Sequence, residues 1–507
     1  EKRNEIMSNF DLIVIGGGPG GYVAAIKGAQ LGLNTAIVEK DRFGGTCLNR
    51  GCIPTKAMLH AADLYREILE GGRFGIHAEK VTVNYGEVLD YKQETIDKLV
   101  SGVEQLLKAN GVTMLKGTGT LLADRQVKVT FAEPAEDGAT ESYYDAEHII
   151  LAGGSYPAKL PVEGMELEGV LTSDGLFALK EIPESLTIIG GGVIGVEFAE
   201  VFSALGCKVT ILEALPKLLA NLDKEISQNL KMILKKRGVD IHTGASLAKI
   251  EKDPAGGLIC HYTEKDKDQS ISSQYVLCAV GRKPNAAGLF LDPEEFADIA
   301  ENSGALTTKH LEAAAQTAHD LGITMERGFI ETDIYGQTGA PGIYAIGDIV
   351  KGIQLAHVAS AQGITAAEKI AGHTPNVDLA IVPSCIYTSP EIASVGITEE
   401  DAKASATPVK VGKYITSANG KSLISKEERG FVKIIAHADT GEILGAQMMC
   451  ARATDMIGEM ATAIANKLTP SQLLKGMRAH PTYNEAVGEA LEELESGAIH
   501  MAPKKKK

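Results

Sequence analysis

The chain has 507 residues, of which 44% are hydrophobic and 23% charged, a balance typical of a globular protein with about three or four domains. Its net charge of −16 argues against a nucleic-acid surface, which needs a basic stripe to meet phosphates. We find no apolar run long enough to span a membrane and no leader pattern, so we expect a cytoplasmic location and neither a membrane nor a nucleic acid as a partner. Met7 is a plausible start of the natural chain, and residues 1–6 are therefore set aside.

The N-terminal segment has the pattern of a dinucleotide-binding unit. A buried strand is predicted over residues 10–15, followed by the glycine-rich stretch from Gly16 to Gly21, a helix to residue 31 and a second strand over 35–38. Glu39 ends that strand, 23 positions after Gly16. This G-x-G-x-x-G arrangement places a pyrophosphate on helix N–H groups and a ribose on the carboxylate, whereas an isolated glycine motif would indicate only a tight turn.

The stretch GGTCLNRGCIPTK, residues 44–56, carries the chemistry of the chain. Pro54 favours a helix start, with the helix predicted over 54–69, so Cys52 is expected at a helix N-terminus, where a thiolate gains about 0.3–1 kcal/mol. A structural disulfide with Cys47 would close a loop worth only on the order of 2 kcal/mol. The other five cysteines are scattered singly, which disfavours zinc. We therefore predict a redox-active dithiol and no metal site.

A second unit of the same kind follows. Strand 186–189 leads into the stretch from Gly190 to Gly195, a helix to residue 205 and a strand over 208–212 that ends at Glu213. Two fingerprints indicate two dinucleotides, and a dithiol needs a two-electron relay to reach a diffusible hydride carrier. We assign FAD to the first, which lies next to the cysteines, and NAD to the second, because Glu213 would accept from a ribose hydroxyl and repel a 2′-phosphate.

The middle of the chain contains a predicted helix over 91–109, strands over 112–115, 126–131 and 148–151, and glycine-bearing strand ends at Gly153, Gly281 and Gly347. Asp348 directly follows the last of these, where its carboxylate can accept from cofactor hydroxyls, although a cap or turn role is the alternative. Residues 286–327 form a long segment with a helix predicted over 306–319, for which a harmless surface addition is the alternative to a functional role.

From about residue 383 the pattern changes to an antiparallel sheet backed by helices. Strands are predicted over 385–387, 393–397, 410–414, 431–436 and 443–449, and helices over 453–467 and 484–495. Between the helices lies HPTYNE, with His480 and Glu485. A lone histidine is more often structural, and spacing alone does not place His480 near Cys47.

The cysteine stretch, both glycine fingerprints, GIYAIGD and HPTYNE, in this order, resemble the pyridine nucleotide–disulfide oxidoreductases, and most closely the members that oxidise dihydrolipoamide. The resemblance covers residues 7–498. It implies an α/β fold with two Rossmann-like dinucleotide-binding domains and a C-terminal α+β dimerisation domain. The expected parts are 7–150 (FAD-binding), 151–283 (NAD-binding), 284–352 (central, with the insertion), 353–498 (dimerisation) and 499–507 (flexible tail).

The resemblance also implies a role for each matching residue. Cys47 would exchange with the substrate, Cys52 would face the flavin, and Lys56, paired with Glu197, would lie by the flavin ring. His480, supported by Glu485, would be the acid/base of the other subunit's active site, which requires a homodimer. The positions expected to contact a cofactor are Gly16, Gly18, Gly21, Glu39, Lys40, Thr46, Lys56, Gly153, Asp348, Gly190, Gly192, Gly195, Glu213 and Gly281.

The implied reaction is oxidation of protein-bound dihydrolipoamide with reduction of NAD+. No lipoyl module precedes Met7, so the partner would be the lipoyl domain of a 2-oxo acid dehydrogenase complex or a glycine cleavage carrier. A reductase for another small thiol, similar to glutathione or mercuric reductase, is the alternative, but no cysteine follows Cys450 and Glu213-Ala214 disfavours NADPH. A non-catalytic scaffold is a third reading, which the complete set of reactive residues disfavours.

Overall fold

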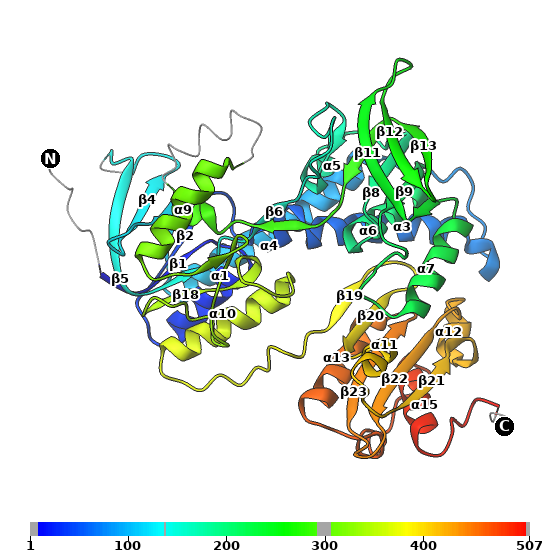
Figure 1. Cartoon of the computed structure of the whole chain (residues 1–507). Helices are drawn as coiled ribbons and strands as arrows, with labels where there is room; N and C mark the ends of the chain where they lie inside the picture. Colours follow the sequence, from blue (N-terminus) through cyan, green and yellow to red (C-terminus); the bar gives the residue numbers. More distant parts are fainter. Residues whose placement is uncertain (1–8, 136–137, 292–305, 503–507) are drawn as a thin grey trace.

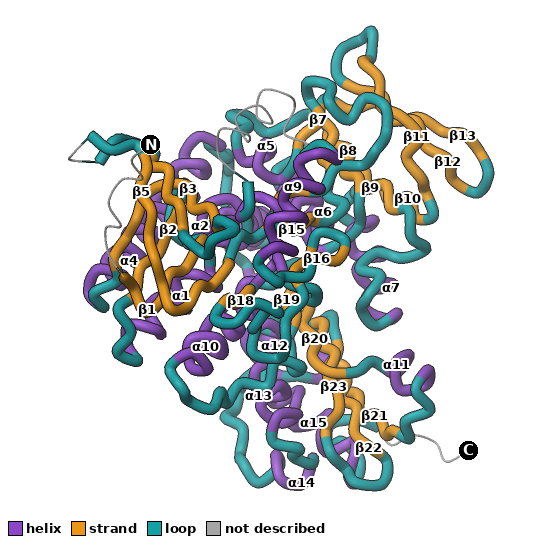
Figure 2. Tube along the Cα trace, turned by 60° about the vertical axis from the view of Figure 1, so that its left-hand side comes forward, coloured by secondary structure: helices purple, strands orange, loops and turns teal. Residues whose placement is uncertain are grey.

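The computed structural model describes residues 9–135, 138–291 and 306–502. Three sheets form three lobes, with the N-terminal sheet on the left of Figure 1, the second upper right and the C-terminal sheet lower right. The strands separate into the same three groups in the tube of Figure 2. This confirms the predicted fold class of two dinucleotide-binding units and a C-terminal α+β domain.

The first lobe has a parallel sheet in the order β3-β2-β1-β5-β18. Strand β4 pairs antiparallel with the C-terminal half of β3 and with the N-terminal part of β5. Its strands are β1 (Asn9–Ile15), β2 (Thr35–Glu39), β3 (Thr113–Leu121), β4 (Val127–Phe131), β5 (Glu141–Leu151) and β18 (Ile343–Ala345). Its helices are α1 (Pro19–Gln30), α2 (Gly45–Arg50), α3 (Cys52–Leu69), η1 (Gly71–Phe74), α4 (Tyr85–Ala109), η3 (Gly347–Ile349) and α10 (Ala356–Ile370).

The second lobe repeats this plan. Its parallel sheet has the order β10-β9-β8-β14-β7, and a three-stranded antiparallel sheet, β11-β12-β13, follows. Its strands are β7 (Val170–Leu171), β8 (Ser185–Ile189), β9 (Lys208–Glu213), β10 (Asp240–Thr243), β11 (Ala245–Lys252), β12 (Leu258–Glu264), β13 (Lys267–Ser273) and β14 (Tyr275–Cys278). Its helices are α5 (Ser173–Phe177), α6 (Val193–Ala204) and α7 (Lys224–Lys236). The strands β6 (Ser155–Pro157) and β15 (Arg282–Pro284) run side by side between the two lobes.

The third lobe is an antiparallel sheet in the order β19-β20-β23-β22-β21, covered by helices. Its strands are β19 (Ser384–Ile386), β20 (Ile392–Gly396), β21 (Val409–Ile415), β22 (Phe431–His437) and β23 (Ile443–Met449). Its helices are α11 (Glu399–Ala404), η4 (Thr416–Ala418), α12 (Gly420–Ser425), α13 (Ala453–Ala465), α14 (Pro470–Leu473) and α15 (Glu485–Glu495).

Several elements begin or lie elsewhere than the sequence pattern suggests. Helix α4 starts six residues early because the side chain of Asn84 caps it, accepting from the N–H of Glu87. The third part was expected to begin at residue 353, but helix α10, which follows this boundary, packs against α1 of the first lobe. Gly20 and Gly363 allow the two helix backbones to approach closely. A flexible tail was expected from residue 499, but its first residues contact α15, because the His500 N–H donates to the carboxylate of Glu489.

The inserted segment lies against the first lobe. Residues 292–305 of it are outside the described residues. The helix predicted over 306–319 is α9 (Thr308–Asp320), capped by Thr307, and its buried Ala314 and Ala318 join the core beneath the first sheet. The short elements around it are η2 (Ala287–Leu289), β16 (Met325–Glu326) and β17 (Phe329–Ile330). The segment predicted to be an insertion therefore extends the core of the first lobe.

Helix α3 connects the first lobe to the second. Met58, Leu59 and Ala62 on α3 pack with Phe198 and Phe202 of α6 in one apolar cluster. The two helices contact each other below the second sheet, right of the centre in Figure 1. Because α3 begins at Cys52, this packing fixes one cysteine relative to the second glycine-rich turn.

Candidate active site

A cavity of about 1560 Å³ runs between the lobes. Both glycine-rich turns, both N-terminal cysteines and the ends of β5, β14 and β18 line it, and the third lobe contributes Tyr387 and Thr454. Every residue predicted to contact a cofactor except Gly195 lines this one cavity, together with Cys47, Cys52 and Glu197. Gly195 instead lies against the turn itself, where a Cβ would collide with the carbonyl oxygen of Gly190. His480 and Glu485 do not line it.

The first glycine-rich turn is shaped to hold a phosphate. Gly16 has a φ of +109°, and a Cβ there would collide with the carbonyl oxygen of Ala152. At Gly18 a Cβ would instead extend into open space in front of the N-terminus of α1, where it would keep a ligand from the helix N–H groups. This cradle fits the pyrophosphate of a dinucleotide.

Glu39 braces this turn at the end of β2. Its carboxylate accepts from the N–H of Gly17 at 2.7 Å and from the N–H of Asp41 at 2.8 Å. Burial raises the pKa of Glu39, although the backbone N–H of Gly17 and the charge and backbone N–H of Lys40 act to lower it. Glu39 thus already has a fixed orientation facing the cavity, as a ribose-binding carboxylate requires.

The second turn has the same geometry. Gly190 has a φ of +110° against the carbonyl of Ala279, and Gly192 leaves open space before α6. Glu213 accepts from the N–H of Gly191 at 2.5 Å and from the N–H of Leu215 at 2.6 Å. The second turn therefore has the same open cradle and the same carboxylate brace as the first.

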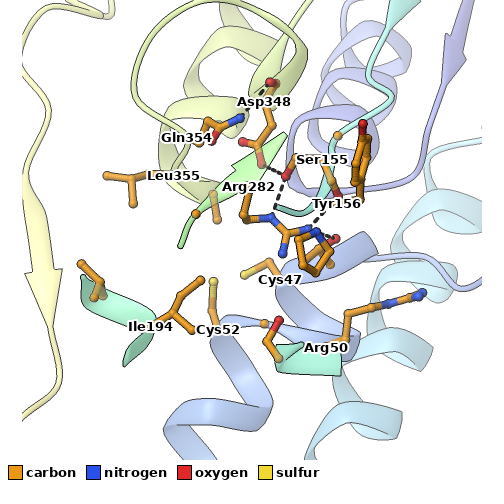
Figure 3. Close-up of a pocket in the computed structure, with 18 of the residues that line it drawn as sticks. Cys47, Arg50, Cys52, Ser155, Tyr156, Ile194, Arg282, Asp348, Gln354 and Leu355 are labelled. Carbon is orange, nitrogen blue, oxygen red and sulfur yellow. Dashed lines mark hydrogen bonds between the residues drawn. The ribbon is translucent and has the colours of Figure 1, made fainter. Parts of the chain in front are cut away.

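The two N-terminal cysteines lie together as free thiols. Cys47 is on α2 and Cys52 is the first residue of α3, and Figure 3 shows their sulfur atoms side by side. The Cys47 thiol donates a hydrogen bond to Cys52, which raises the pKa of Cys47 and lowers that of Cys52 to about 7 against the effect of burial. The nearby Lys56 ammonium lowers the pKa of Cys52 further. The pair therefore holds one thiol and one readily formed thiolate.

This asymmetry predicts a specific pH dependence. In the reduced protein, the alkylation rate of Cys52 by iodoacetamide should rise with pH and level off above a midpoint near 7, because only the thiolate reacts. Replacing Lys56 by methionine should raise the midpoint. Arg50 lies between the two cysteines, so tryptic peptides report each one separately by mass spectrometry. A midpoint at the ordinary value of 9.0 would contradict the geometry.

Lys56 forms an ion pair across the boundary between the lobes. Its Nζ donates to Glu197 Oε2 at 2.8 Å and to Oε1 at 3.1 Å, and the Glu197 side chain is only 3% exposed. The backbone N–H of Tyr387 also donates to Glu197 Oε1, at 3.0 Å. The structure thus brings together the two residues that the sequence places 141 positions apart.

A chain of polar groups opposite the cysteines includes two residues that the sequence analysis missed. Ser155 Oγ donates to the carboxylate of Asp348, and Arg282 Nε donates to Ser155 Oγ at 2.7 Å (Figure 3). The guanidinium also donates to the Ser155 carbonyl oxygen at 2.6 Å and approaches Thr46 Oγ1 at 3.5 Å. Burial lowers the pKa of Arg282, but a guanidinium remains charged at any working pH. The sequence does contain a signal for Ser155 and Arg282, because each follows a glycine-bearing strand end, at Gly153 and at Gly281.

His480 and Glu485 form a separate pair on the third lobe. His480 Nδ1 lies 2.9 Å from Glu485 Oε1, and Glu485 Oε2 accepts from the N–H of Thr482. Burial acts to raise the pKa of Glu485, but the Thr482 N–H and the imidazole outweigh it and hold that pKa below its ordinary value. The His480 side chain is 77% exposed. Within one chain, His480 faces solvent and not the cavity.

Two family models match nearly the whole chain. The model described as pyridine nucleotide-disulphide oxidoreductase matches residues 10–314 and 311–363, and the model of the dimerisation domain of the same family matches residues 382–491. The chain belongs to the pyridine nucleotide-disulphide oxidoreductases.

Curated relatives in this family share the full length of the chain. Dihydrolipoyl dehydrogenase of Bacillus subtilis is 40% identical over 501 residues, which cover 97% of this chain and 100% of that protein. The Chlamydia pneumoniae protein of the same name is 39% identical over 496 residues, or 98% and 99% of the two chains.

Solved structures of family members have the same architecture. LpdA of Mycobacterium tuberculosis is 25% identical and superposes with a TM-score of 0.83 over 96% of this chain and 100% of that one. The Cu(II) complex of the flavoprotein disulfide reductase RclA of Escherichia coli is 27% identical, with a TM-score of 0.79 over 96% and 99%.

Membership of this oxidoreductase family confirms the enzyme class and the two cofactors predicted from the sequence. The protein is a flavin-dependent disulfide oxidoreductase that uses FAD and NAD(H) and carries a dimerisation domain. The two open cradles at Gly18 and Gly192 fit these groups. None of the helices in the described parts of the chain is long and apolar enough to cross a membrane.

Proposed function

We propose that this enzyme oxidises dihydrolipoamide carried by another protein and transfers the electrons to NAD+. The observation that carries the proposal is the Cys47–Cys52 pair beside Lys56, in one cavity with two dinucleotide cradles. The substrate class is supported by the full-length relatives named dihydrolipoyl dehydrogenase. The use of NAD+ is supported by Glu213, whose carboxylate would repel a 2′-phosphate.

The pKa difference between the cysteines supports different roles for them in thiol–disulfide exchange. When the pair is oxidised, a substrate thiolate attacks the sulfur whose partner is the better leaving group, and a thiol of lower pKa leaves faster. Cys52 has the lower pKa, so attack falls on Cys47 and releases the Cys52 thiolate. The second substrate thiol then displaces Cys47, which leaves lipoamide as the cyclic disulfide and both cysteines reduced.

The cofactor-facing residues have matching roles. We assign FAD to the first cradle, with Gly16, Gly18, Gly21, Glu39, Lys40, Thr46, Lys56, Gly153 and Asp348 around it, and NAD to the second, with Gly190, Gly192, Gly195, Glu213 and Gly281. Arg282 supplies a half-buried positive charge for a pyrophosphate on the FAD side. When bound, FAD provides the two-electron path from the dithiol to NAD+.

The proton from the substrate needs a base, and the one that we propose, His480, does not line this cavity within one chain. His480 is exposed on the dimerisation domain, and Glu485 fixes its tautomer through Nδ1, which leaves Nε2 free to take a proton. We propose that His480 of the partner subunit completes each active site. The substrate arm would belong to a lipoyl domain of a 2-oxo acid dehydrogenase complex or to a glycine cleavage carrier.

A side-by-side assay tests the substrate class. With NADH as donor, the enzyme should reduce lipoamide, and we expect turnover of glutathione disulfide or Hg(II) to be lower by a factor of roughly 100 or more. NADPH should replace NADH poorly because of Glu213. Faster reduction of glutathione disulfide than of lipoamide would transfer the assignment to the small-thiol reductases.

A further inference from the structure

All three lobes meet at the ammonium group of Lys56. Lys56 extends from α3 of the first lobe, and Glu197 from α6 of the second lobe accepts both of its short hydrogen bonds. Tyr387 lies directly after β19 of the third lobe, and its ring centroid is 4.8 Å from Lys56 Nζ. The ammonium is therefore held between a carboxylate and the face of an aromatic ring.

Tyr387 makes two contacts to this ion pair through different atoms. Its backbone N–H donates to Glu197 Oε1 at 3.0 Å, and its ring face covers Lys56. A cation within about 6 Å of a ring centroid is attracted by the ring, and more strongly when it is partly removed from water. The Lys56 side chain is 30% exposed, so the ring occupies space that water would otherwise take.

The lysine needs such a support because its side chain is flexible. Glu197 alone holds the ammonium from one side, and four methylene groups allow it several positions around a single carboxylate. Lys56 and Cys52 line the same cavity, and the ammonium lowers the pKa of Cys52. A small displacement of Lys56 would thus alter the ionisation of Cys52.

We infer that Tyr387 is a positioning residue whose aromatic ring fixes the Lys56 ammonium against Glu197 and so maintains the Cys52 thiolate. The phenol takes no part as a charged group, because burial raises the pKa of Tyr387 to about 12. The consequence of Tyr387 for turnover rests on the proposed function, but its effect on the thiolate does not. Tyr387 thereby makes the third lobe part of the redox site.

The test is the pH dependence of Cys52 alkylation in the reduced holoenzyme, with iodoacetamide as the probe. Tyr387→Leu removes the ring and keeps the backbone bond to Glu197, and it should raise the midpoint by about 0.3–1 pH unit. Tyr387→Phe keeps the ring and should leave the midpoint within about 0.2 unit of the wild type. A shift of equal size in both variants would assign the effect to the hydroxyl and overturn the inference.

A double variant separates positioning from a general disturbance of the fold. In a Lys56→Met protein the ring has no ammonium to hold, so adding Tyr387→Leu should move the midpoint no further. An equal shift in both backgrounds, or none in the single leucine variant, would contradict the role. Because this readout needs neither lipoamide nor NAD+, failure of the substrate assignment would leave it unaffected.

Discussion

Replacing Cys52 by serine is expected to lower NAD+-dependent oxidation of dihydrolipoamide by a factor of roughly 10⁴ or more, to the background of the assay. A hydroxyl forms no disulfide with Cys47, so the protein loses the oxidised state that accepts the substrate's electrons. The substitution also removes the sulfur whose pKa lies near 7, and with it the better leaving group. Initial rates of NADH formation measure the loss.

Two controls make the result specific. Cys278→Ser should retain wild-type turnover within about twofold, because a serine there can still donate to the carbonyl oxygen of Ala158. The Cys52→Ser protein should keep its yellow colour and flavin content, since Asp348, Ser155 and Arg282 are unchanged. Substantial turnover in Cys52→Ser, or comparable loss in Cys278→Ser, would show that the cysteine pair is not the redox centre.

Local pattern was sufficient to predict the elements that position the cofactors. The glycines at 16–21 and 190–195 sit between a strand and a helix, and the acid that ends the next strand braces each turn through backbone N–H groups. The environment of Cys52 also followed from its place before Pro54. These features depend on neighbours within one βαβ unit, which is why a single sequence reveals them.

Local pattern did not predict the contacts between lobes, and only the family resemblance indicated the pair of Lys56 and Glu197. Arg282 meets Ser155 across 127 positions, and the Tyr387 N–H meets Glu197 across 190 positions. No periodicity or spacing in the sequence joins such residues, because the packing of β6 on β15 and of the third lobe on α6 brings them together. The start of α4 was predicted too late because the prediction followed the apolar pattern, whereas the Asn84 side chain caps the helix before that pattern begins.

His480→Gln is expected to lower turnover by a factor of about 10²–10⁴, the usual contribution of a general acid/base. Glutamine fits the same space and can still donate to Glu485, but it takes up no proton. His500→Gln is the matched control, because His500 is also exposed on the third lobe and pairs with a carboxylate, that of Glu489. Equal losses in the two variants would mean that either substitution merely disturbs the lobe.

Hybrid dimers test whether His480 acts across the subunit boundary. A dimer of one Cys52→Ser subunit and one His480→Gln subunit contains an intact site only if the cysteine of one chain works with the histidine of the other. In that case one of its two sites pairs Cys52 and His480 in native form, and the other lacks both. Random mixing of the two inactive subunits should then restore about a quarter of wild-type activity.

The position of His480 makes this recovery the expected result. In a single chain the histidine is 77% exposed on the dimerisation domain and is absent from the wall of the cavity that contains Cys47 and Cys52. If each chain used its own histidine, every hybrid would hold one site without the cysteine and one without the base, and mixing would restore nothing. Separately tagged subunits, purified through both tags, isolate the hybrid, whose activity should then approach half that of the wild type.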